Sequence, residues 1–443
     1  MNLDAIFKAY DIRGVYPDEI DEEAAHAIGR AFVLFSGASR IGVGHDMRAS
    51  SEPLSTAFIS GAATQGADVV DLGLVSTDLL YYASGHLSMP GAMFTASHNP
   101  AEYNGIKMCL SGAAPVGQDT GLADIKELAT HGRFPASKKL GTIQRIDLLG
   151  AYVDHVLSQA DLGDMRPLTV AADAANGMGG LVAPALFERL PVKLVPLYFD
   201  LDGTFPNHPA DPLQPANLVD LQRAVTESQA DIGIAFDGDA DRAFFLDERG
   251  EPVSGSLTAA LVAQSILGKH PGEKAIHNII CSRVVPETIR EMGGEPIRSR
   301  VGHSFIKELM ARTGAIFGAE HSGHYYFRDN YRADSGLIAA VHVLSVLGSR
   351  DEPLSKILQP FRRYWNSGEI NTDVADQAAA IAAVATAFPE GAQDLTDGLT
   401  VEWDDRWFNV RPSNTEPLLR LNVEARDAQV GEVLRDRVLG IFR

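Results

Sequence analysis

The stretch IGVGHDMRASSEPLSTAFISGAATQGADVVDL, residues 41–72, contains a complete strand–helix–strand unit. Its two ends, 41–46 and 67–72, are short apolar runs typical of buried strands. Between them, apolar side chains recur at helical spacing, at Leu54, Phe58 and Ala62. A helix that joins neighbouring parallel strands is the building unit of α/β proteins, so this stretch predicts a parallel or mixed sheet covered by helices.

Two further stretches repeat this plan. One runs from a strand at 168–173, through a helix that begins near Gly179, to a strand at 192–197. The other runs from a strand at 275–281, through a helix at 284–292, to a strand near Pro296. The three units start roughly 110–130 residues apart, a spacing that predicts three similar α/β domains in series.

The C-terminal part has a different order of elements. An Ala-rich helix at 374–388 precedes strands at 399–403, 406–410 and 418–423 and a last helix at 428–442. Strands that follow one another directly favour an α+β domain. With 443 residues the chain is too long for one compact core. We therefore expect four domains, with limits in loops at 1–147, 148–246, 247–359 and 360–443.

Composition excludes several classes of protein. The chain has 38 Lys and Arg against 58 Asp and Glu, a net charge of −20, so its average surface repels nucleic acid and anionic membranes. Two distant cysteines, Cys109 and Cys281, give no disulfide framework or thiolate metal site. No apolar run approaches the ~20 residues of a membrane span, and the N-terminus does not resemble a signal peptide. We expect a cytoplasmic protein with no nucleic-acid or membrane partner; the sequence leaves its oligomeric state open.

The motif TASHNP, residues 95–100, places a serine where it can react. Pro100 and Gly105 keep this stretch from forming a regular helix, so Ser97 is expected in a loop, where its hydroxyl can reach a ligand. Taken alone, Ser97 is better explained as a residue that caps a turn.

A second motif, DIGIAFDGDADR at residues 231–242, is a strand that runs into three carboxylates, Asp237, Asp239 and Asp241. Such close like charges repel unless a hard divalent cation binds them, and Mg²⁺ is the usual ion in phosphate chemistry. An EF-hand loop requires Gly where Arg242 stands, and a haloacid dehalogenase phosphatase has Thr or Val in place of Asp241. A solvated acidic turn fits poorly with the apolar flanks. We interpret the motif as a magnesium site with Arg242 facing a phosphate.

Two more motifs suit a phosphorylated sugar. GAEHSGHYYF, residues 318–327, sets Glu320 beside Ser322, a pair suited to sugar hydroxyls; a metal site on His321 and His324 is disfavoured, because no Cys or His cluster accompanies them. RPSNTEP, residues 411–417, combines the guanidinium of Arg411 with several donors in one turn, as a phosphate monoester requires, although an ordinary hairpin loop fits equally well.

In this order, with KAYDIRG at residues 8–14 in front, these motifs resemble the α-D-phosphohexomutase superfamily, and most of all its bacterial phosphomannomutase/phosphoglucomutase branch. The resemblance implies a heart-shaped molecule of four domains around one central cleft. It also implies an intramolecular phosphotransferase that interconverts hexose 1-phosphate and hexose 6-phosphate. The reaction would pass through a phosphoserine enzyme and a hexose 1,6-bisphosphate, which also serves as activator. Mannose is the expected sugar, with glucose as a second substrate.

The resemblance assigns roles to single residues. Ser97 would carry the phosphoryl group and, through it, bind Mg²⁺ together with Asp237, Asp239 and Asp241. Arg242 would contact the same phosphate or its sugar, and Tyr10, Arg13, His98 and Asn99 would line this end of the cleft. Glu320 and Ser322 would bind sugar hydroxyls, and Arg411, Ser413, Asn414 and Thr415 the remote phosphate. Lys107, His303 and His324 are the candidates for proton transfer, with Lys107 and His324 preferred.

Three alternatives remain at this point. A metal-dependent sugar phosphatase would use Ser97 or Asp237 as nucleophile and water as acceptor. A phosphoglucosamine mutase would belong to the same superfamily but act on another sugar. A sugar-phosphate or Ca²⁺-binding module is the alternative without catalysis, and it has no need of an exposed serine beside a metal site.

Overall fold

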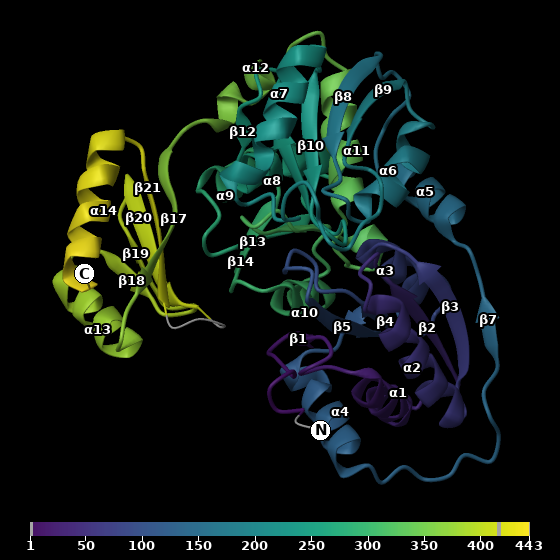
Figure 1. Ribbon diagram of the computed structural model, residues 1–443. Helices are drawn as coiled ribbons and strands as arrows, with labels where there is room; N and C mark the ends of the chain where they lie inside the picture. Colours follow the sequence, from purple (N-terminus) through teal and green to yellow (C-terminus); the bar gives the residue numbers. More distant parts are fainter. Residues whose placement is uncertain (1–2, 414–417, 443) are drawn as a thin grey trace.

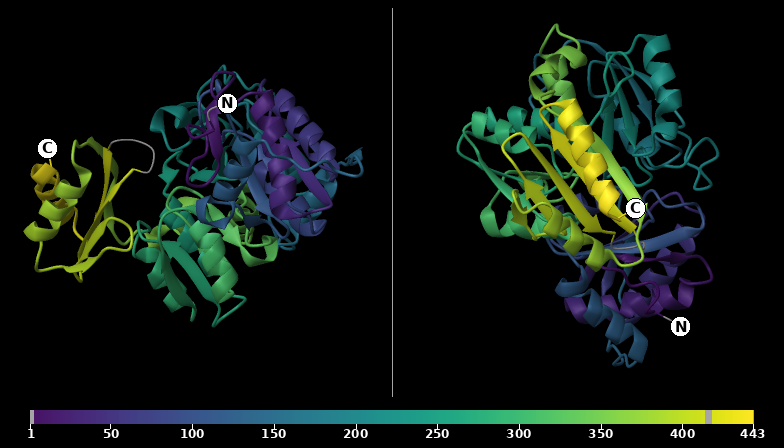
Figure 2. Two further views of the ribbon diagram at one scale, coloured as in Figure 1. Left: turned by 90° about the horizontal axis from the view of Figure 1, so that it is seen from below. Right: turned by 90° about the vertical axis from the view of Figure 1, so that its left-hand side faces the viewer.

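The computed structural model of the chain describes residues 3–413 and 418–442. Within these residues the strands form four sheets, each built from a consecutive part of the chain. Figures 1 and 2 show three of these parts packed closely together, while the C-terminal part (yellow) stands to one side, next to the third (green). The prediction of α/β domains followed by a different C-terminal domain is confirmed.

The N-terminal sheet has the order β1-β5-β4-β2-β3-β7, with β6 paired to β5. Neighbours from β4 to β7 are parallel, and β1, β5 and β6 pair antiparallel, so the sheet is mixed. Its strands are β1 (Ile12–Val15), β2 (Arg40–His45), β3 (Asp68–Leu74), β4 (Gly91–Phe94), β5 (Tyr103–Leu110), β6 (Ala114–Pro115) and β7 (Ile143–Arg145). Its helices are α1 (Glu22–Ser36), α2 (Ser51–Thr64), α3 (Thr77–His86) and α4 (Leu122–His131). The predicted unit is β2, α2 and β3, and Leu54, Phe58 and Ala62 are fully buried.

The second sheet has the order β12-β11-β10-β8-β9 and is also mixed. The predicted unit forms β8, α6 and β9, and β10 adds parallel to β8. Its strands are β8 (Leu168–Asp173), β9 (Val192–Leu197), β10 (Ile232–Phe236), β11 (Ala243–Leu246) and β12 (Pro252–Val253). The helices of this part are α5 (Leu149–Leu157), α6 (Gly179–Phe187) and α7 (Val219–Ser228).

The third sheet has the order β14-β13-β15-β16. Its strands are β13 (Lys274–Asn278), β14 (Glu295–Ser299), β15 (Phe317–Ala319) and β16 (Tyr325–Phe327). Its helices are α8 (Gly255–Leu267), α9 (Val284–Glu291), α10 (His303–Thr313), α11 (Gly336–Gly348) and α12 (Leu354–Ile357). The strand predicted at 275–281 ends earlier, at Asn278, and the apolar Ile279, Ile280 and Cys281 are buried beyond the sheet.

The C-terminal sheet, β17-β21-β20-β19-β18, is antiparallel throughout the described residues. Its elements are β17 (Trp365–Asp373), α13 (Gln377–Ala387), β18 (Ala392–Asp394), β19 (Leu399–Glu402), β20 (Arg406–Pro412), β21 (Leu418–Ala425) and α14 (Ala428–Phe442). Strand β17 was not predicted from the sequence, because its residues WNSGEINTD are mostly polar and are all exposed or only partly buried. The predicted helix at 374–388 begins instead at Gln377, where the Asp376 side chain caps it by accepting from Ala379 N–H.

One hydrophobic core joins the first three parts of the chain. It includes Leu80 of α3, Val156 of α5 and Leu337 of α11, all fully buried. The C-terminal part has a separate core, which includes Phe388, Val410 and Val438. This division explains why side chains from three sheets meet in one rigid site. Among the described residues, no helix is both long and apolar enough to cross a membrane.

Candidate active site

Ser97 lies just after β4, in a loop of residues 95–100 that we call the serine loop. Its backbone is left-handed, with φ of +49°, a conformation that only a small fraction of non-glycine residues adopt. The Ser97 Oγ donates to Asp237 Oδ2 at 2.7 Å, and Arg242 Nη2 lies 3.3 Å from the same hydroxyl. The hydroxyl therefore faces a carboxylate and a guanidinium brought from a different sheet.

Arg48 holds the serine loop from behind. Its two terminal nitrogens donate to four main-chain carbonyl groups, those of Ser97, Asn99, Pro100 and Tyr103, at 2.6–3.0 Å. The side chain is buried and also pairs with Asp46 at 3.3 Å. A guanidinium carries five donors in a rigid fork, so no other side chain can satisfy this many carbonyls in this geometry.

The three predicted carboxylates lie in residues 237–242, the acidic loop, directly after β10. Asp237, Asp239 and Asp241 are all buried, and each offers an oxygen within 4.8 Å of the others. Burial raises the pKa of Asp237 to about 8 despite the attraction of Arg242. Burial acts in the same direction on Asp239, but the Lys107 ammonium outweighs it and holds that pKa below its usual range. Lys107 and Arg242 bring two positive charges against these three buried carboxylates.

The acidic loop fits a hard divalent cation. Asp239 Oδ1 and Asp241 Oδ1 are buried with no hydrogen-bond partner among the described residues. Carboxylate oxygens are the ligands that Mg²⁺ prefers in proteins. The donor set is therefore suited to that ion, with Ser97 beside it.

Basic side chains enclose the same place. Lys107 Nζ lies 2.7 Å from both Asp239 Oδ2 and Asp241 Oδ2, and the two carboxylates raise the Lys107 pKa well above its usual value, although burial opposes this. Arg13 donates to the Ala96 carbonyl and to the Asn99 side chain. His98 Nδ1 accepts from Arg242 at 2.6 Å and lies 3.3 Å from Ser97 Oγ.

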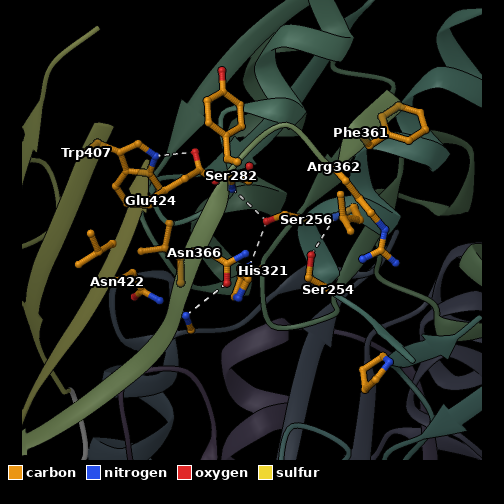
Figure 3. A pocket seen from close by; sticks show the side chains of 16 residues that line it. Ser254, Ser256, Ser282, His321, Phe361, Arg362, Asn366, Trp407, Asn422 and Glu424 are labelled. Carbon is orange, nitrogen blue, oxygen red and sulfur yellow. Dashed lines mark hydrogen bonds between the residues drawn. The ribbon is translucent and has the colours of Figure 1, made fainter. Parts of the chain in front are cut away.

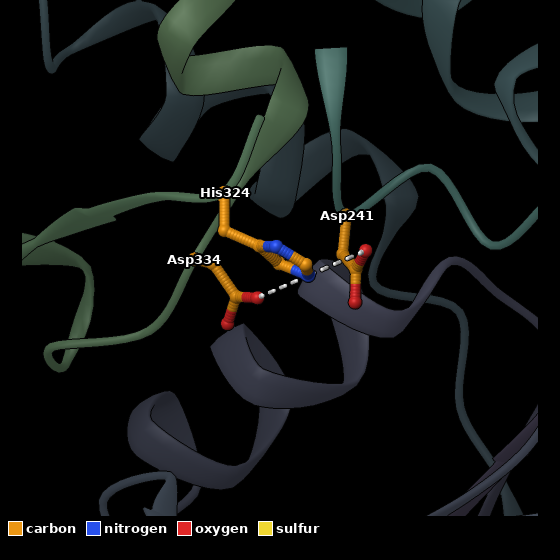
Figure 4. Close-up of side chains that lie close together, drawn as sticks. All are labelled: Asp241, His324 and Asp334. Atoms are coloured by element: carbon orange, nitrogen blue, oxygen red, sulfur yellow. Dashed lines mark ion pairs between the residues drawn. The ribbon is translucent and has the colours of Figure 1, made fainter. Parts of the chain in front are cut away.

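His324 reaches this cluster from the third sheet. Its Nε2 lies 3.9 Å from Asp241 Oδ1 and 3.9 Å from Asp334 Oδ2, and Figure 4 shows the ring between the two carboxylates. On its other side, Nδ1 lies 3.1 Å from the Ser322 hydroxyl. Asp334 is buried and pairs with Lys307 at 2.7 Å, so its own charge is compensated.

Glu320 and His303 are the remaining predicted residues of the third domain, and both lie outside the strands of its sheet. Glu320 is buried and accepts from Tyr326 Oη at 2.6 Å and from Gly302 N–H at 3.0 Å. His303, which follows Gly302, contacts Tyr10 edge to face, with ring centres 5.4 Å apart. Burial, helped by the nearby Lys307 ammonium, lowers the pKa of His303 to about 3, so its ring is neutral.

The predicted phosphate clamp lies in the C-terminal part. Arg411 is buried, donates to Asn422 at 2.9 Å and pairs with Glu369. Ser413 accepts from Arg420 at 3.4 Å. Asn414 and Thr415 lie outside the described residues.

A pocket of about 330 Å³ lies between this C-terminal part and the third domain. Figure 3 shows that its wall includes Trp407 and Glu424 on one side and Ser256 and His321 on the other. Arg411 and Ser413 do not line this pocket, and they belong to a different domain from the predicted residues that converge around Ser97.

Sequence analysis missed three residues of this site, Arg48, Thr77 and Asp334. Thr77 donates its hydroxyl to Asp239 Oδ2 at 2.6 Å and its N–H to the Asp239 carbonyl at 3.1 Å. The only local signal for Arg48 is a lone arginine in the HDMRASSEP segment at the start of a predicted helix. Nothing local marks Thr77 or Asp334, because their partners are remote in sequence.

Comparison with known proteins shows which protein family the chain belongs to. Four family models of phosphoglucomutase/phosphomannomutase match in order: domain I at residues 4–136, domain II at 150–250, domain III at 254–364 and the C-terminal domain at 369–441. The chain belongs to the phosphoglucomutase/phosphomannomutase family, and it is an enzyme of the phosphohexomutase class. The prediction of a phosphohexomutase is thereby favoured over a phosphatase or a binding module.

Individual proteins of this family are similar to the chain over nearly its full length. A phosphomannomutase of Salmonella montevideo is 41% identical over 98% of this chain and 99% of its own length. A phosphohexose mutase of Xanthomonas campestris is 38% identical over 99% of both chains. A crystal structure of a phosphoglucomutase/phosphomannomutase family protein from Burkholderia thailandensis matches with a TM-score of 0.91 and 33% identity, covering 98% of this chain and 97% of that one.

Proposed function

We propose that this enzyme interconverts mannose 1-phosphate and mannose 6-phosphate, with glucose phosphates as second substrates. The observation that carries the proposal is the contact of Ser97 Oγ with Asp237 and Arg242, which places one hydroxyl between an acidic loop and a guanidinium. A phosphoryl group on this oxygen would lie against Arg242 and His98. Phosphoryl transfer depends mostly on positioning and on stabilising charge, and this site supplies both.

In the proposed cycle, phospho-Ser97 gives its phosphoryl group to the free hydroxyl of a hexose monophosphate. The bond between phosphorus and Ser97 Oγ breaks, the bond to the sugar oxygen forms, and a base takes the hydroxyl proton. The resulting hexose 1,6-bisphosphate turns around and returns its other phosphate to Ser97. The same bisphosphate would rephosphorylate an enzyme that has lost its phosphate, and so act as activator.

The residues of the site support specific roles in this cycle. When bound by Asp237, Asp239, Asp241 and an oxygen of the Ser97 phosphate, Mg²⁺ would neutralise charge on the transferred group. Lys107 and His324 are our candidates for moving the proton, since both lie against the acidic loop. His303 is the third candidate, and Tyr10, Arg13 and Asn99 complete the wall.

The other predicted residues would hold the sugar and its second phosphate. Glu320 and Ser322 would read the sugar hydroxyls, and Arg411, Ser413, Asn414 and Thr415 would bind the phosphate that is not reacting. Among related folds, an Aspergillus fumigatus N-acetylphosphoglucosamine mutase was solved in complex with GlcNAc-6P and magnesium, at 14% identity and a TM-score of 0.61. We also retain as proposals the domain limits at 147, 246 and 359 and a cytoplasmic location.

Two measurements test the proposal. Incubation with substrate labelled in its phosphate should leave an acid-stable, base-labile label on Ser97. A hydroxylamine-labile label on Asp237 would contradict it and favour a phosphatase. Comparison of kcat/KM for mannose 1-phosphate, glucose 1-phosphate and glucosamine 1-phosphate should rank mannose first; a preference for glucosamine 1-phosphate would contradict the choice of sugar.

A further inference from the structure

A buried carboxylate that belongs to none of the motifs lies at the junction of three domains. Asp78, the second residue of α3, is fully buried. Its Oδ1 accepts from the Ser76 hydroxyl. Its Oδ2 accepts from the Tyr152 hydroxyl of α5 and from the Ser335 hydroxyl at 2.7 Å. Burial of a carboxylate costs free energy, and the three donors to Asp78 are neutral hydroxyls rather than cations. This cost indicates that Asp78 has a functional role.

Two of these donors cap helices. Ser76 is the N-cap of α3 and accepts from Leu79 N–H, while Ser335 is the N-cap of α11 and accepts from Ile338 N–H. Asp78 therefore joins the first turns of two helices that come from different domains. Burial raises the pKa of Asp78 to about 7 even with the three hydroxyl donors, which reflects how completely water is excluded.

The N-terminal ends of α3 and α11 both contact the acidic loop. At the α3 end, Thr77 donates through N–H and Oγ1 to Asp239. At the α11 end, Gly336 packs so tightly that a Cβ would lie 2.7 Å from the carbonyl carbon of Arg242 and 3.0 Å from the Ala240 carbonyl oxygen. The residue before Ser335 is Asp334, which faces His324.

We propose that Asp78 is a positioning residue for the acidic loop: it ties the N-terminal ends of α3 and α11 together, and these ends hold Asp239 and the main chain of Arg242 in the geometry that the cation requires. This inference rests on the proposed function of the acidic loop. The hydroxyl partners of Asp78 lie outside the acidic loop, so it would act on that loop through Thr77 and Gly336. Sequence alone gives no sign of it, because two of its three donors lie 74 and 257 residues away.

The test measures cation binding directly, with Mn²⁺ as the probe and electron paramagnetic resonance as the readout, so no turnover is needed. Asp78→Asn keeps the size of the side chain but replaces one acceptor oxygen with a donor. Loss of an outer partner of a metal ligand weakens metal affinity by about ten- to a hundredfold. We expect a Mn²⁺ dissociation constant about tenfold higher and a similarly lower kcat, with KM for mannose 1-phosphate within about twofold of the original value.

Further variants separate positioning from general stability. Thr77→Val should reproduce the loss of Mn²⁺ affinity. Thr77→Ser keeps the hydroxyl and should bind Mn²⁺ as tightly as the unaltered enzyme. Leu347→Ala, in the same hydrophobic core but about 16 Å along α11 from Gly336, should lower thermal stability with unchanged Mn²⁺ binding. If Asp78→Asn does not fold, Tyr152→Phe removes one donor and is measured in its place.

An unchanged Mn²⁺ dissociation constant in folded Asp78→Asn, or in Tyr152→Phe if that variant replaces it, would overturn the inference. Failure of the proposed function has a different signature. In that case the unaltered enzyme would bind Mn²⁺ yet fail to interconvert sugar phosphates, and the comparison between variants would still decide the role of Asp78.

Discussion

The hydroxyl of Ser97 donates to Asp237 Oδ2 at 2.7 Å although the two residues are 140 positions apart in the chain. Ser97 belongs to the first sheet and Asp237 to the second, and the core shared by the first three domains holds the two sheets together. This contact places the proposed phosphoryl carrier at the proposed cation site. The first prediction below tests Ser97 as the phosphoryl carrier, and the second tests the acidic loop as the cation site.

Ser97→Ala should remove nearly all turnover, by about a thousandfold or more, because a methyl group cannot carry the phosphoryl group. Folding and binding of mannose 1-phosphate should be largely retained, since a methyl group in place of one Oγ disturbs little packing. Steady-state kinetics and calorimetric titration check both parts. Activity near that of the unaltered enzyme would assign the phosphoryl group to another residue.

Asp239→Asn should raise the Mg²⁺ concentration for half-maximal activity by about tenfold or more, because the loop loses one ligand charge. Phosphorylation of Ser97, followed by mass spectrometry, should fall in parallel. Asp220→Asn, a half-exposed carboxylate of α7, provides a control with the same loss of charge. Normal activity of the unaltered enzyme in EDTA would rule out the metal site.

Arg48→Lys should lower kcat by about tenfold while leaving KM within about twofold. A lysine keeps the charge but cannot donate to four carbonyl groups at once, so the serine loop loses its fixed geometry. Hydrogen bonds to charged groups contribute about 1.5–3 kcal/mol each, and loss of one or two should also lower the free energy of unfolding by about 2–4 kcal/mol. A variant that loses stability but keeps kcat would limit Arg48 to a structural role.

Arg411→Ala should cost about ten- to a hundredfold in kcat/KM for 1-phosphate and 6-phosphate substrates alike, since the clamp would hold whichever phosphate is not reacting. Deletion of residues from about 360 onward should leave a protein that still carries phosphate on Ser97 but cannot isomerise sugars. Kinetics in both directions and phosphoserine content measure these effects. A change below about twofold in kcat/KM would identify residues 411–417 as an ordinary turn.

His342 offers a prediction of pH dependence away from the site. It is buried in α11, stacks on Phe327 at 5.5 Å, and has a pKa lowered to about 4 by burial and, to a lesser degree, by Lys269. The unfolded chain therefore binds a proton near pH 6.5 that the folded protein rejects until about pH 4. Stability from this group is fully present above pH 6.5 and is lost as the pH falls towards 4.

His342→Gln should reduce that loss by up to about 1.4 kcal/mol per pH unit within this range. Urea unfolding at several pH values between 4 and 8 gives the measurement. His270→Gln, a surface histidine with high exposure, is the matched control and should leave the slope unchanged. Equal slopes for the unaltered protein and His342→Gln would show that His342 accepts its proton without unfolding.

The sequence by itself determined the elements whose signals are local. The helix with Leu54, Phe58 and Ala62 and the strand at 168–173 were predicted because their apolar patterns reflect burial. The strand at 192–197 was predicted from its apolar run at the end of the second unit, and it is only partly buried. The motifs around Ser97 and Asp237 also give a local signal, because each places several polar or charged side chains at neighbouring positions. Strand β17 was missed because its polar residues pair at a sheet edge through main-chain hydrogen bonds, which leave no pattern of side chains.

Only the tertiary structure decided which remote groups meet. Arg48 binds the serine loop through main-chain carbonyls, and every residue type carries a carbonyl, so no sequence pattern marks its partners. Thr77 contacts the acidic loop, and Asp334 contacts His324. These contacts form because the first three domains share one core, and packing between domains depends on the shape of whole surfaces. Asp78 is the extreme case, since its position becomes meaningful only when Tyr152 and Ser335 arrive from two other domains.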